Sequence, residues 1–293
     1  MRRLFAVRLL SLTAVFATAC SLLVDSGGLA GTAEAPGADD ALAPFEGSVD
    51  GPSVDGSSGG IDSPADVTAD SPASDTYRDA VLADGPIAYF RLEEAIGGGA
   101  CKNEIASSTV SCILPSSATT PGAGGITAKT RSLRFDAAAA RLNVFGATTF
   151  SGEQPFTIEA WFLLDGPAAG QVLFDNTDGP PPLRTGQVLY GMPDSTLQSE
   201  AWSGGTHLLY GHTLTPFPVG TWAHIVLLYS SVLQKDLLYV NGQAADAQRL
   251  AAGARGAATA ALMFGGFIGQ VDEVAIYPTA LTPERIAAHI AAR

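Results

Sequence analysis

The chain has 293 residues, a net charge of −13 at pH 7 and an apolar fraction of 46%. This length and apolar content suffice for one large domain with a tail. The charge is unevenly placed, because residues 20–76 carry 11 acidic side chains and no Lys or Arg. No stretch of the chain forms a basic patch, so binding to a phosphate backbone is disfavoured and we expect no nucleic-acid partner.

Residues 1–19 have the pattern of a secretory signal peptide. Three arginines form a positively charged N-terminal region. The apolar stretch 9–19 that follows is too short to span a bilayer. Small residues at 17–19 fit cleavage directly before Cys20. The run Ala17-Thr18-Ala19-Cys20 resembles a bacterial lipobox, although Leu is commonest where this chain has Ala17. The resemblance implies an exported lipoprotein of the bacterial cell envelope, at the outer membrane or cell surface. The alternative is ordinary cleavage beside an incidental Cys.

The cysteine count agrees with lipidation of Cys20. The chain has three cysteines, an odd number for an exported protein. If Cys20 carries lipid, Cys101 and Cys112 remain as a pair in an oxidising compartment. We predict a disulfide between them, in a loop rich in Gly, Ser and Ala, worth about 3 kcal/mol in the chain-entropy model. Two unpaired thiols are the alternative.

Residues 20–76 are predicted to be an acidic, disordered linker. The segment consists mainly of Asp, Ala, Gly, Ser and Pro, with few large apolar residues to offset the cost of ordering. As a flexible coil it would reach on the order of 40 Å, which suits a tether between a membrane and a domain. The globular domain is expected over residues 77–293.

The first part of this domain predicts a short helix and several strands. Asp75 or Thr76 can cap a helix that runs through Ala83, and Ile87–Leu92 then has a strand pattern. Residues 132–135 and 142–144 form a predicted strand pair across a small-residue turn. Residues 156–164 alternate between two faces over nine residues. Further short strands are expected at 171–174, 187–190, 196–202 and 207–212.

The second part contains the clearest local pattern, Gly220 to Gln243. A run that is apolar on both faces, with His224 as its only strongly polar residue, predicts a strand covered on both sides. A second strand, 237–240, leads into Asn241-Gly242, the commonest two-residue hairpin turn, and a third strand from Gln243. Residues 269–277 are the expected last strand, before a closing helix with Pro283 at its first position.

Several of these segments together resemble a known family. They are 80–92, the run Phe-Thr-Ile-Glu-Ala-Trp at 156–161, Trp222-x-His224, Leu-Tyr-Val-Asn-Gly at 238–242, and 269–277. They are similar to laminin G-like domains of the concanavalin A-like lectin/glucanase superfamily, although Phe90 replaces a Trp and Phe135-Asp136-Ala137 departs from a common Phe-x-Gly step. The resemblance implies an all-β jelly-roll sandwich of two antiparallel sheets.

The sequence does not predict an enzyme. Related glucanases carry two carboxylates on one strand face, as hydrolysis requires, whereas Glu159 has Thr157 and Trp161 as its same-face neighbours. Asp272 and Glu273 are adjacent and are expected on opposite faces. The histidines lack zinc-site spacing, and no nucleophile elbow or phosphate-binding loop occurs. A separate carboxylate that meets Glu159 in space remains an open alternative.

Trp202, Tyr210 and His212 are the predicted ligand-binding residues. In a regular strand Trp202 shares a face with Gln198 and Glu200 rather than with Leu197 and Ala201. Tyr210 and His212 of the next strand can join it there. Aromatic faces beside hydrogen-bonding groups suit sugar rings or flat peptide surfaces. The alternative is a surface aromatic that shields the edge of the core.

Asp272 raises the question of a metal ion. Its alternation with Val274 and Ile276 predicts that it points inward and needs a partner. Some laminin G-like domains hold one calcium ion at the rim, and Asp272 and Asp136 could contribute oxygens to one here. The alternative is that backbone N–H groups or an arginine such as Arg134 satisfy Asp272.

These observations predict a lipid-anchored extracytoplasmic binding module that recognises carbohydrate or a surface protein. A structural envelope component without a specific ligand is the competing hypothesis, and a glycan-active enzyme of the same fold is a further one. One fold of this kind hosts lectins, glucanases and adhesion modules, so the fold alone does not choose between them.

Overall fold

The structure is a computed structural model that describes residues 75–94, 99–117, 119–121, 124–127, 130–146, 154–180, 183–249, 255–256 and 258–293. The predicted signal peptide, Cys20 and nearly all of the predicted linker lie outside these residues. The described residues belong to one compact unit. Among them, no helix is both long and apolar enough to cross a membrane.

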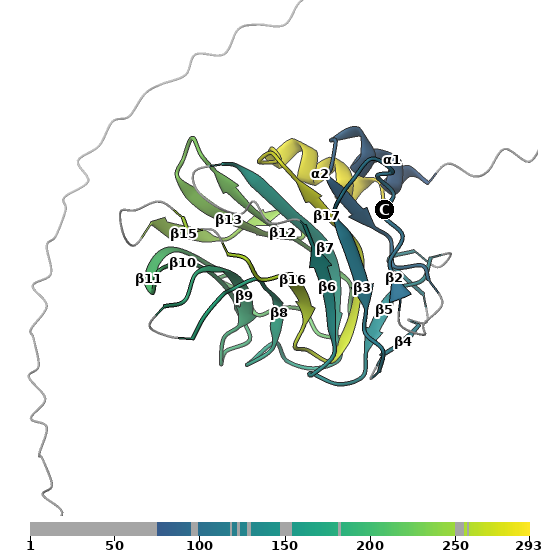
Figure 1. Ribbon diagram of the computed structural model, residues 1–293, viewed down its shortest axis with the longest axis horizontal. Coiled ribbons are helices and arrows are strands. Elements are labelled where there is room, and N and C mark those ends of the chain that lie inside the picture. Colours follow the sequence, from purple (N-terminus) through teal and green to yellow (C-terminus); the bar gives the residue numbers. More distant parts are fainter. Residues whose placement is uncertain are drawn as a thin grey trace, which may run out of the picture. The chain divides into compact units, whose positions relative to one another are not determined.

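Two antiparallel sheets form the domain (Figure 1). Sheet A has the order β14-β13-β12-β7-β17-β5-β4, with β1 paired to β17. Its strands are β1 (Ala88–Phe90), β4 (Thr119–Pro121), β5 (Leu133–Phe135), β7 (Phe156–Leu164), β12 (Ala223–Ser230), β13 (Lys235–Val240), β14 (Gln243–Ala244) and β17 (Gly269–Tyr277).

Sheet B has the order β15-β11-β10-β9-β8-β16-β6-β3-β2. Its strands are β2 (Gly99–Ala100), β3 (Ser111–Leu114), β6 (Arg141–Phe145), β8 (Val172–Asp175), β9 (Gly186–Gly191), β10 (Leu197–Ser203), β11 (Thr206–His212), β15 (Asp246–Arg249) and β16 (Leu262–Gly265). The predicted all-β sandwich of two antiparallel sheets is therefore confirmed.

The main core lies between the two sheets, and β7 shows how the sequence builds it. Phe156, Ile158 and Phe162 belong to this core, together with Phe174 and Phe264 of sheet B. The intervening side chains point to the other side of sheet A, as the alternation predicts. There Trp161 belongs to a second buried apolar cluster.

Two helices cover this second cluster, α1 (Thr76–Ala83) and α2 (Pro283–Ala291), which lie together beside sheet A (Figure 1). The Asp75 side chain caps α1 by accepting from the backbone N–H of Arg78, and Thr282 caps α2 in the same way. Both caps satisfy backbone donors that the first helical turn leaves free. The helices bury Val81 and Ile286 against sheet A.

The hairpin at Asn241-Gly242 confirms the turn prediction. Asn241 has φ of 49° and Gly242 has φ of 77°, so both central residues adopt the positive φ that a type I′ turn requires. The turn connects β13 to β14, which pair through Val240 and Gln243. Strand β12 lies between β13 and β7 and is buried on both faces, as its continuous apolar run predicts.

The prediction that residues 132–135 pair with 142–144 is wrong. The first segment is β5, which pairs with β17 and β4 in sheet A. The second lies in β6, which pairs with β16 and β3 in sheet B. The chain therefore crosses from one sheet to the other between the two strands, and Phe135 and Leu142 enter the core from opposite sides.

The Cys101–Cys112 disulfide is confirmed, with Cα atoms 5.1 Å apart. Its surroundings differ from the predicted loop, because Cys112 lies on β3 and is fully buried. The backbone N–H of Cys101 also donates to the Cys112 carbonyl at 3.0 Å. The bridge therefore fixes the β2–β3 hairpin at the edge of sheet B.

Candidate functional site

Polar and aromatic side chains gather on the side of sheet B that faces away from the core. In β10, Leu197 and Ala201 enter the core, so alternation directs Gln198, Glu200 and Trp202 outward. The neighbouring strands β9 and β11 present their side chains beside them. We call this surface the Trp202 face, and define it by Tyr190, Gln198, Glu200, Trp202, His207, Tyr210 and His212.

The three predicted ligand-binding residues lie together on this face. The register pairs Gln198 with His212 and Glu200 with Tyr210, so their side chains share one side of the sheet. The rings of Tyr210 and His212 are stacked, with centroids 6.0 Å apart and planes inclined by 21°. Trp202 joins them through His207, whose ring lies 6.4 Å from that of Tyr210.

His207 is a member of the face that the sequence did not predict. Regular alternation along β11 places His207 opposite to Tyr210 and His212. A register shift between Ala201 and Trp202 pairs Trp202 with His207 and leaves Leu208 unpaired, buried in the core. The indole and imidazole rings consequently stack, with centroids 4.6 Å apart and planes inclined by 11°.

Glu200 is the polar centre of the face. One carboxylate oxygen accepts from the Tyr190 hydroxyl at 2.7 Å and from the Gln198 amide at 2.6 Å. The other accepts from the indole N–H of Trp202 at 2.9 Å. Burial opposes the ionised form, but these donors outweigh it and hold the pKa of Glu200 below its ordinary value. The carboxylate is therefore charged, and three donors fix its position.

Arg184 supplies a positive charge beside Trp202. Its guanidinium carbon lies 5.8 Å from the centre of the indole ring, within the range of a cation–π contact. The Arg184 carbonyl accepts from the N–H of Gly205, which connects it to the turn after β10. The aromatic residues of the face are half-buried, so the surface combines exposed ring area with oriented donors and acceptors. Such a surface can bind a ligand that has both an apolar and a hydroxylated side.

A second polar cluster lies beneath the helices, around Glu159 of β7. This carboxylate accepts from the hydroxyls of Tyr77 and Tyr277, at 3.0 and 2.9 Å. The imidazole of His224 lies 2.7 Å from it, and that of His289 lies 2.9 Å from it. We call these five residues the Glu159 cluster. Glu159, His224 and His289 have no exposed surface.

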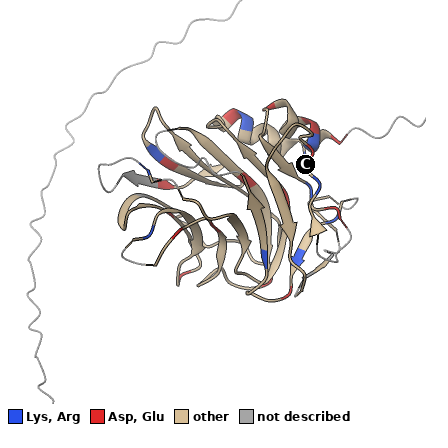
Figure 2. Ribbon diagram, in the orientation of Figure 1, with Lys and Arg blue, Asp and Glu red and all other residues tan. Residues whose placement is uncertain are grey.

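The charged groups of the Glu159 cluster stabilise one another's ionised forms. Burial alone would raise the pKa of Glu159, but His224 and His289 outweigh burial and hold that pKa well below its usual range. Burial would likewise lower the pKa of His289, whereas Glu159 and Asp84 raise it. Charged residues also gather on the two helices (Figure 2). The sequence left open whether a second carboxylate meets Glu159 in space. Among the described residues, the partners of Glu159 are two imidazoles and two hydroxyls.

The predicted orientation of Asp272 is wrong. The β17 register shifts between Asp272 and Ala275, and Glu273 has φ of 52°. Val271 and Val274 therefore both enter the main core, while Asp272 lies opposite Trp161 on the helix-covered side. Glu273 contacts the Tyr89 hydroxyl on this same side, so the prediction that the two carboxylates face opposite ways is also wrong.

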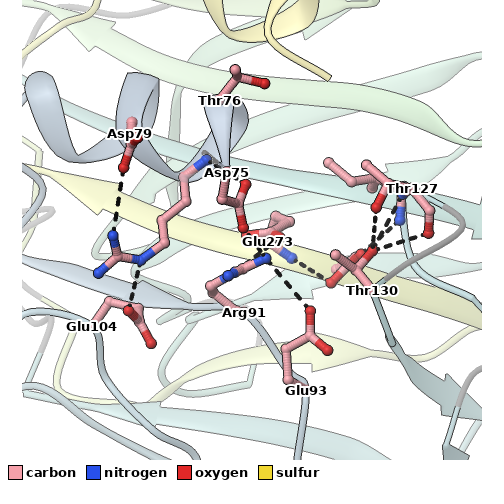
Figure 3. A network of polar contacts seen from close by, with 12 residues as sticks. Asp75, Thr76, Asp79, Arg91, Glu93, Glu104, Thr127, Thr130 and Glu273 are labelled. Atoms are coloured by element: carbon pink, nitrogen blue, oxygen red, sulfur yellow. Dashed lines mark hydrogen bonds and ion pairs between the residues drawn. The ribbon is translucent and has the colours of Figure 1, made fainter. Parts of the chain in front are cut away.

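Backbone groups satisfy Asp272. Its carboxylate accepts from the N–H of Ile126 at 2.8 Å and from the N–H of Glu273 at 3.0 Å. Burial, followed by the charge of Glu273, raises the pKa of Asp272 well above its ordinary value. Burial likewise raises the pKa of Glu273 to about 7, despite the contacts with Tyr89 and Arg91. Arg91 lies between Asp75, Glu93 and Glu273 (Figure 3).

Asp136, the other predicted calcium ligand, is exposed and accepts from the Arg134 guanidinium at 3.0 Å. Within the part of the chain that the structure describes, no three or more His, Cys, Asp or Glu side chains form a group that could hold a metal ion. The side chains of Asp272 and Asp136 thus have protein partners of their own. Calcium binding stays a prediction of the sequence.

The fold is that of the concanavalin A-like sandwiches, and comparison with known proteins identifies the family. Residues 136–287 match the laminin G family described as "Concanavalin A-like lectin/glucanases superfamily". The match covers 152 of the 293 residues, so the chain belongs to this family and the resemblance seen in the sequence is confirmed. No curated protein matches the chain by sequence.

Solved structures share the fold at low sequence identity. The binding domain of Paraclostridial Mosquitocidal Protein 1 has a TM-score of 0.56 and 16% identity, over 70% of this chain and 52% of that one. The binding domain of botulinum neurotoxin serotype D has a TM-score of 0.54 and 10% identity, over 71% and 51%. A Trypanosoma rangeli sialidase has a TM-score of 0.52 and 14% identity, over 73% and 37%. The chain thus spans about half the length of the two toxin domains.

Proposed function

We propose that this protein is a carbohydrate-binding module of the bacterial cell envelope, and that the Trp202 face is its binding site. The observation that carries the proposal is the row of aromatic rings around a fixed carboxylate. A pyranose ring has an apolar C–H face that packs on aromatic side chains, and hydroxyls that bond with carboxylate, amide and imidazole groups. On three adjacent strands, the Trp202 face offers partly exposed aromatic and imidazole rings around the buried, hydrogen-bonded carboxylate of Glu200.

The structural neighbours support a binding role of this class. Two of them are binding domains of toxins, and the serotype D domain also has a structure in complex with N-acetylneuraminic acid. These names concern the neighbours, with which the chain shares a fold at 10–16% identity. The choice of carbohydrate for this chain therefore rests on the side chains of the Trp202 face.

We also propose that the domain binds its ligand without hydrolysing it. Glycoside hydrolysis needs one carboxyl group to donate a proton and a second to act as nucleophile or base. Both oxygens of Glu200 already accept hydrogen bonds, and its lowered pKa disfavours the protonated form that a general acid requires. Glu159 is buried beneath the helices, where a glycan does not reach it.

The proposed location rests on the sequence alone. We propose that Cys20 carries the lipid anchor and that the acidic linker holds the domain away from the membrane. A protein partner at the cell surface and a purely structural role are the alternatives, and a binding screen distinguishes them from glycan recognition. A glycan array probed with the full-length protein in detergent is the first experiment. Wild-type protein that binds no glycan would refute carbohydrate recognition.

Trp202→Ala then tests the site. The substitution should weaken glycan binding by about 2 kcal/mol or more, the effect of losing an aromatic anchor. It removes one hydrogen bond, one stacking contact and one cation–π contact of a half-buried residue, so it should cost stability of only about 1–2 kcal/mol. Trp161→Ala is the matched control, because this fully buried indole should cost about 3–5 kcal/mol of stability. Unchanged glycan affinity of Trp202→Ala would show that the site lies elsewhere.

A further inference from the structure

The Trp202 indole has two close neighbours of different chemistry, an imidazole and a guanidinium. In the sheet, Trp202 is flanked by Gly186 of β9 and by His207 of β11. The His207 imidazole covers one side of the indole. Arg184 precedes Gly186 by two residues, and its guanidinium carbon lies 5.8 Å from the centre of the indole ring. A ligand that packs on the Trp202–His207 pair would therefore lie close to the positive charge of Arg184.

The charge of Arg184 has no carboxylate partner among the described residues. Most other basic side chains around the domain do have one, such as Arg134 with Asp165 or Arg285 with Asp84. The carboxylate nearest in the face, Glu200, has its oxygens occupied by Tyr190, Gln198 and Trp202. Arg184 is also partly exposed. Its N–H donors are thus free to contact a ligand.

We propose that the Trp202 face prefers saccharides with a carboxylate group, and that Arg184 determines this preference. The inference rests on the proposed carbohydrate-binding function and adds the chemical class of the sugar. A guanidinium presents a planar fork of donors that matches a carboxylate in two parallel hydrogen bonds. Since the whole chain has a net charge of −13, long-range attraction does not favour an acidic ligand. A local cation beside the stacking surface provides the recognition instead.

The test compares each acidic sugar with a matched neutral form. The probes are oligogalacturonides and sialyl-lactose, each as free acid and as methyl ester, so that only the carboxyl group differs, losing its charge and gaining a methyl group. Full-length wild-type protein should bind at least one free acid about tenfold or more tightly than its ester, which is about 1.4 kcal/mol. Arg184→Gln should remove this difference by weakening binding of the acid, with ester binding unchanged.

Arg131→Gln is the matched control, because Arg131 is an exposed arginine that precedes β5 of the other sheet. It should leave the preference intact, and both variants should melt close to wild type because they change surface side chains. Equal affinity of wild type for acid and ester would overturn the inference, as would Arg184→Gln weakening both forms alike. In either case, Trp202-dependent binding of neutral glycans would leave the proposed function standing. Binding of no saccharide at all would refute both.

Discussion

The Glu159 cluster makes a sharp prediction about stability. Replacing Glu159 with Gln keeps the shape of the side chain but removes the charge that His224 and His289 contact. Four side chains from four different elements converge on this carboxylate, Tyr77 of α1, His224 of β12, Tyr277 of β17 and His289 of α2. The amide of Gln also brings two donors into a site that presents donors to the carboxylate. The cluster would therefore lose both its charge balance and part of its hydrogen bonding.

The expected cost is large because none of the central groups reaches water. Removing one partner of a buried ion pair typically costs about 3–5 kcal/mol. For a domain of about 200 residues each kcal/mol corresponds to roughly 2–4 °C in the melting temperature, so Glu159→Gln should melt about 6–20 °C below wild type. Glu284→Gln is the matched control, since this carboxylate is exposed in the first turn of α2. It should cost no more than about 1 kcal/mol through the helix dipole.

The pH dependence of the unfolding free energy tests why Glu159→Gln is expected to be less stable. His289 has a raised pKa in the folded protein, so its stabilising contribution is complete below its unfolded value of about 6.5 and is lost as the pH rises through the folded pKa. The unfolding free energy of the wild type should therefore fall as the pH rises from about 6.5 through the folded pKa of His289. Glu159→Gln should flatten the fall, because Asp84 alone remains to hold the charged imidazole. Denaturant unfolding at several pH values measures both effects. A variant within 1 kcal/mol of wild type, or one with an unchanged pH slope, would contradict the ionic interpretation.

Three further predictions concern the anchor, the disulfide and calcium. Cys20→Ser should release the protein from membranes, because a multiply acylated cysteine is a stable anchor; unchanged membrane partitioning would exclude lipidation at Cys20. The double change Cys101→Ala and Cys112→Ala should lower the unfolding free energy by about 3 kcal/mol, and an unaltered denaturation midpoint would show that the bridge does not stabilise the fold. If Asp272 or Asp136 helps to bind calcium, calcium should raise the melting temperature and a chelator should lower it; no shift up to millimolar calcium would refute a stabilising site.

Local patterns in the sequence predicted most of the elements. The alternation of β7 identified both its core side and its other side, because a strand's side chains alternate with a fixed period of two. Asn241-Gly242 predicted its hairpin because both residues tolerate positive φ. A capping residue predicted the start of α1, and Pro283 at the first helical position predicted the start of α2. These features depend on neighbouring residues, which is why the sequence alone was sufficient for them.

Two of the errors arise where one residue interrupts the period of a strand. At Asp272 the shifted register and the positive φ of Glu273 invert the alternation, so a residue expected in the core lies on the other side. At Trp202 a similar shift brings His207 onto the face. A β-bulge of this kind is fixed by pairing with another strand, and the strand's own sequence does not mark its position. The Glu159 cluster was likewise unpredictable, because Glu159 and His289 are separated by 130 residues.

Polar residues have different roles on the outer sides of the two sheets, because the described helices cover only the outer side of sheet A. Helices α1 and α2 close the outer side of sheet A, so a charge there must be paired within the protein, as Glu159 is. The described helices leave the Trp202 face of sheet B uncovered. The carboxylate of Glu200 accepts hydrogen bonds from neutral donors, but the aromatic rings and Arg184 keep exposed surface. Two polar clusters of similar composition thus differ in accessibility, and accessibility is what makes the Trp202 face a candidate for ligand recognition and the Glu159 cluster a determinant of stability.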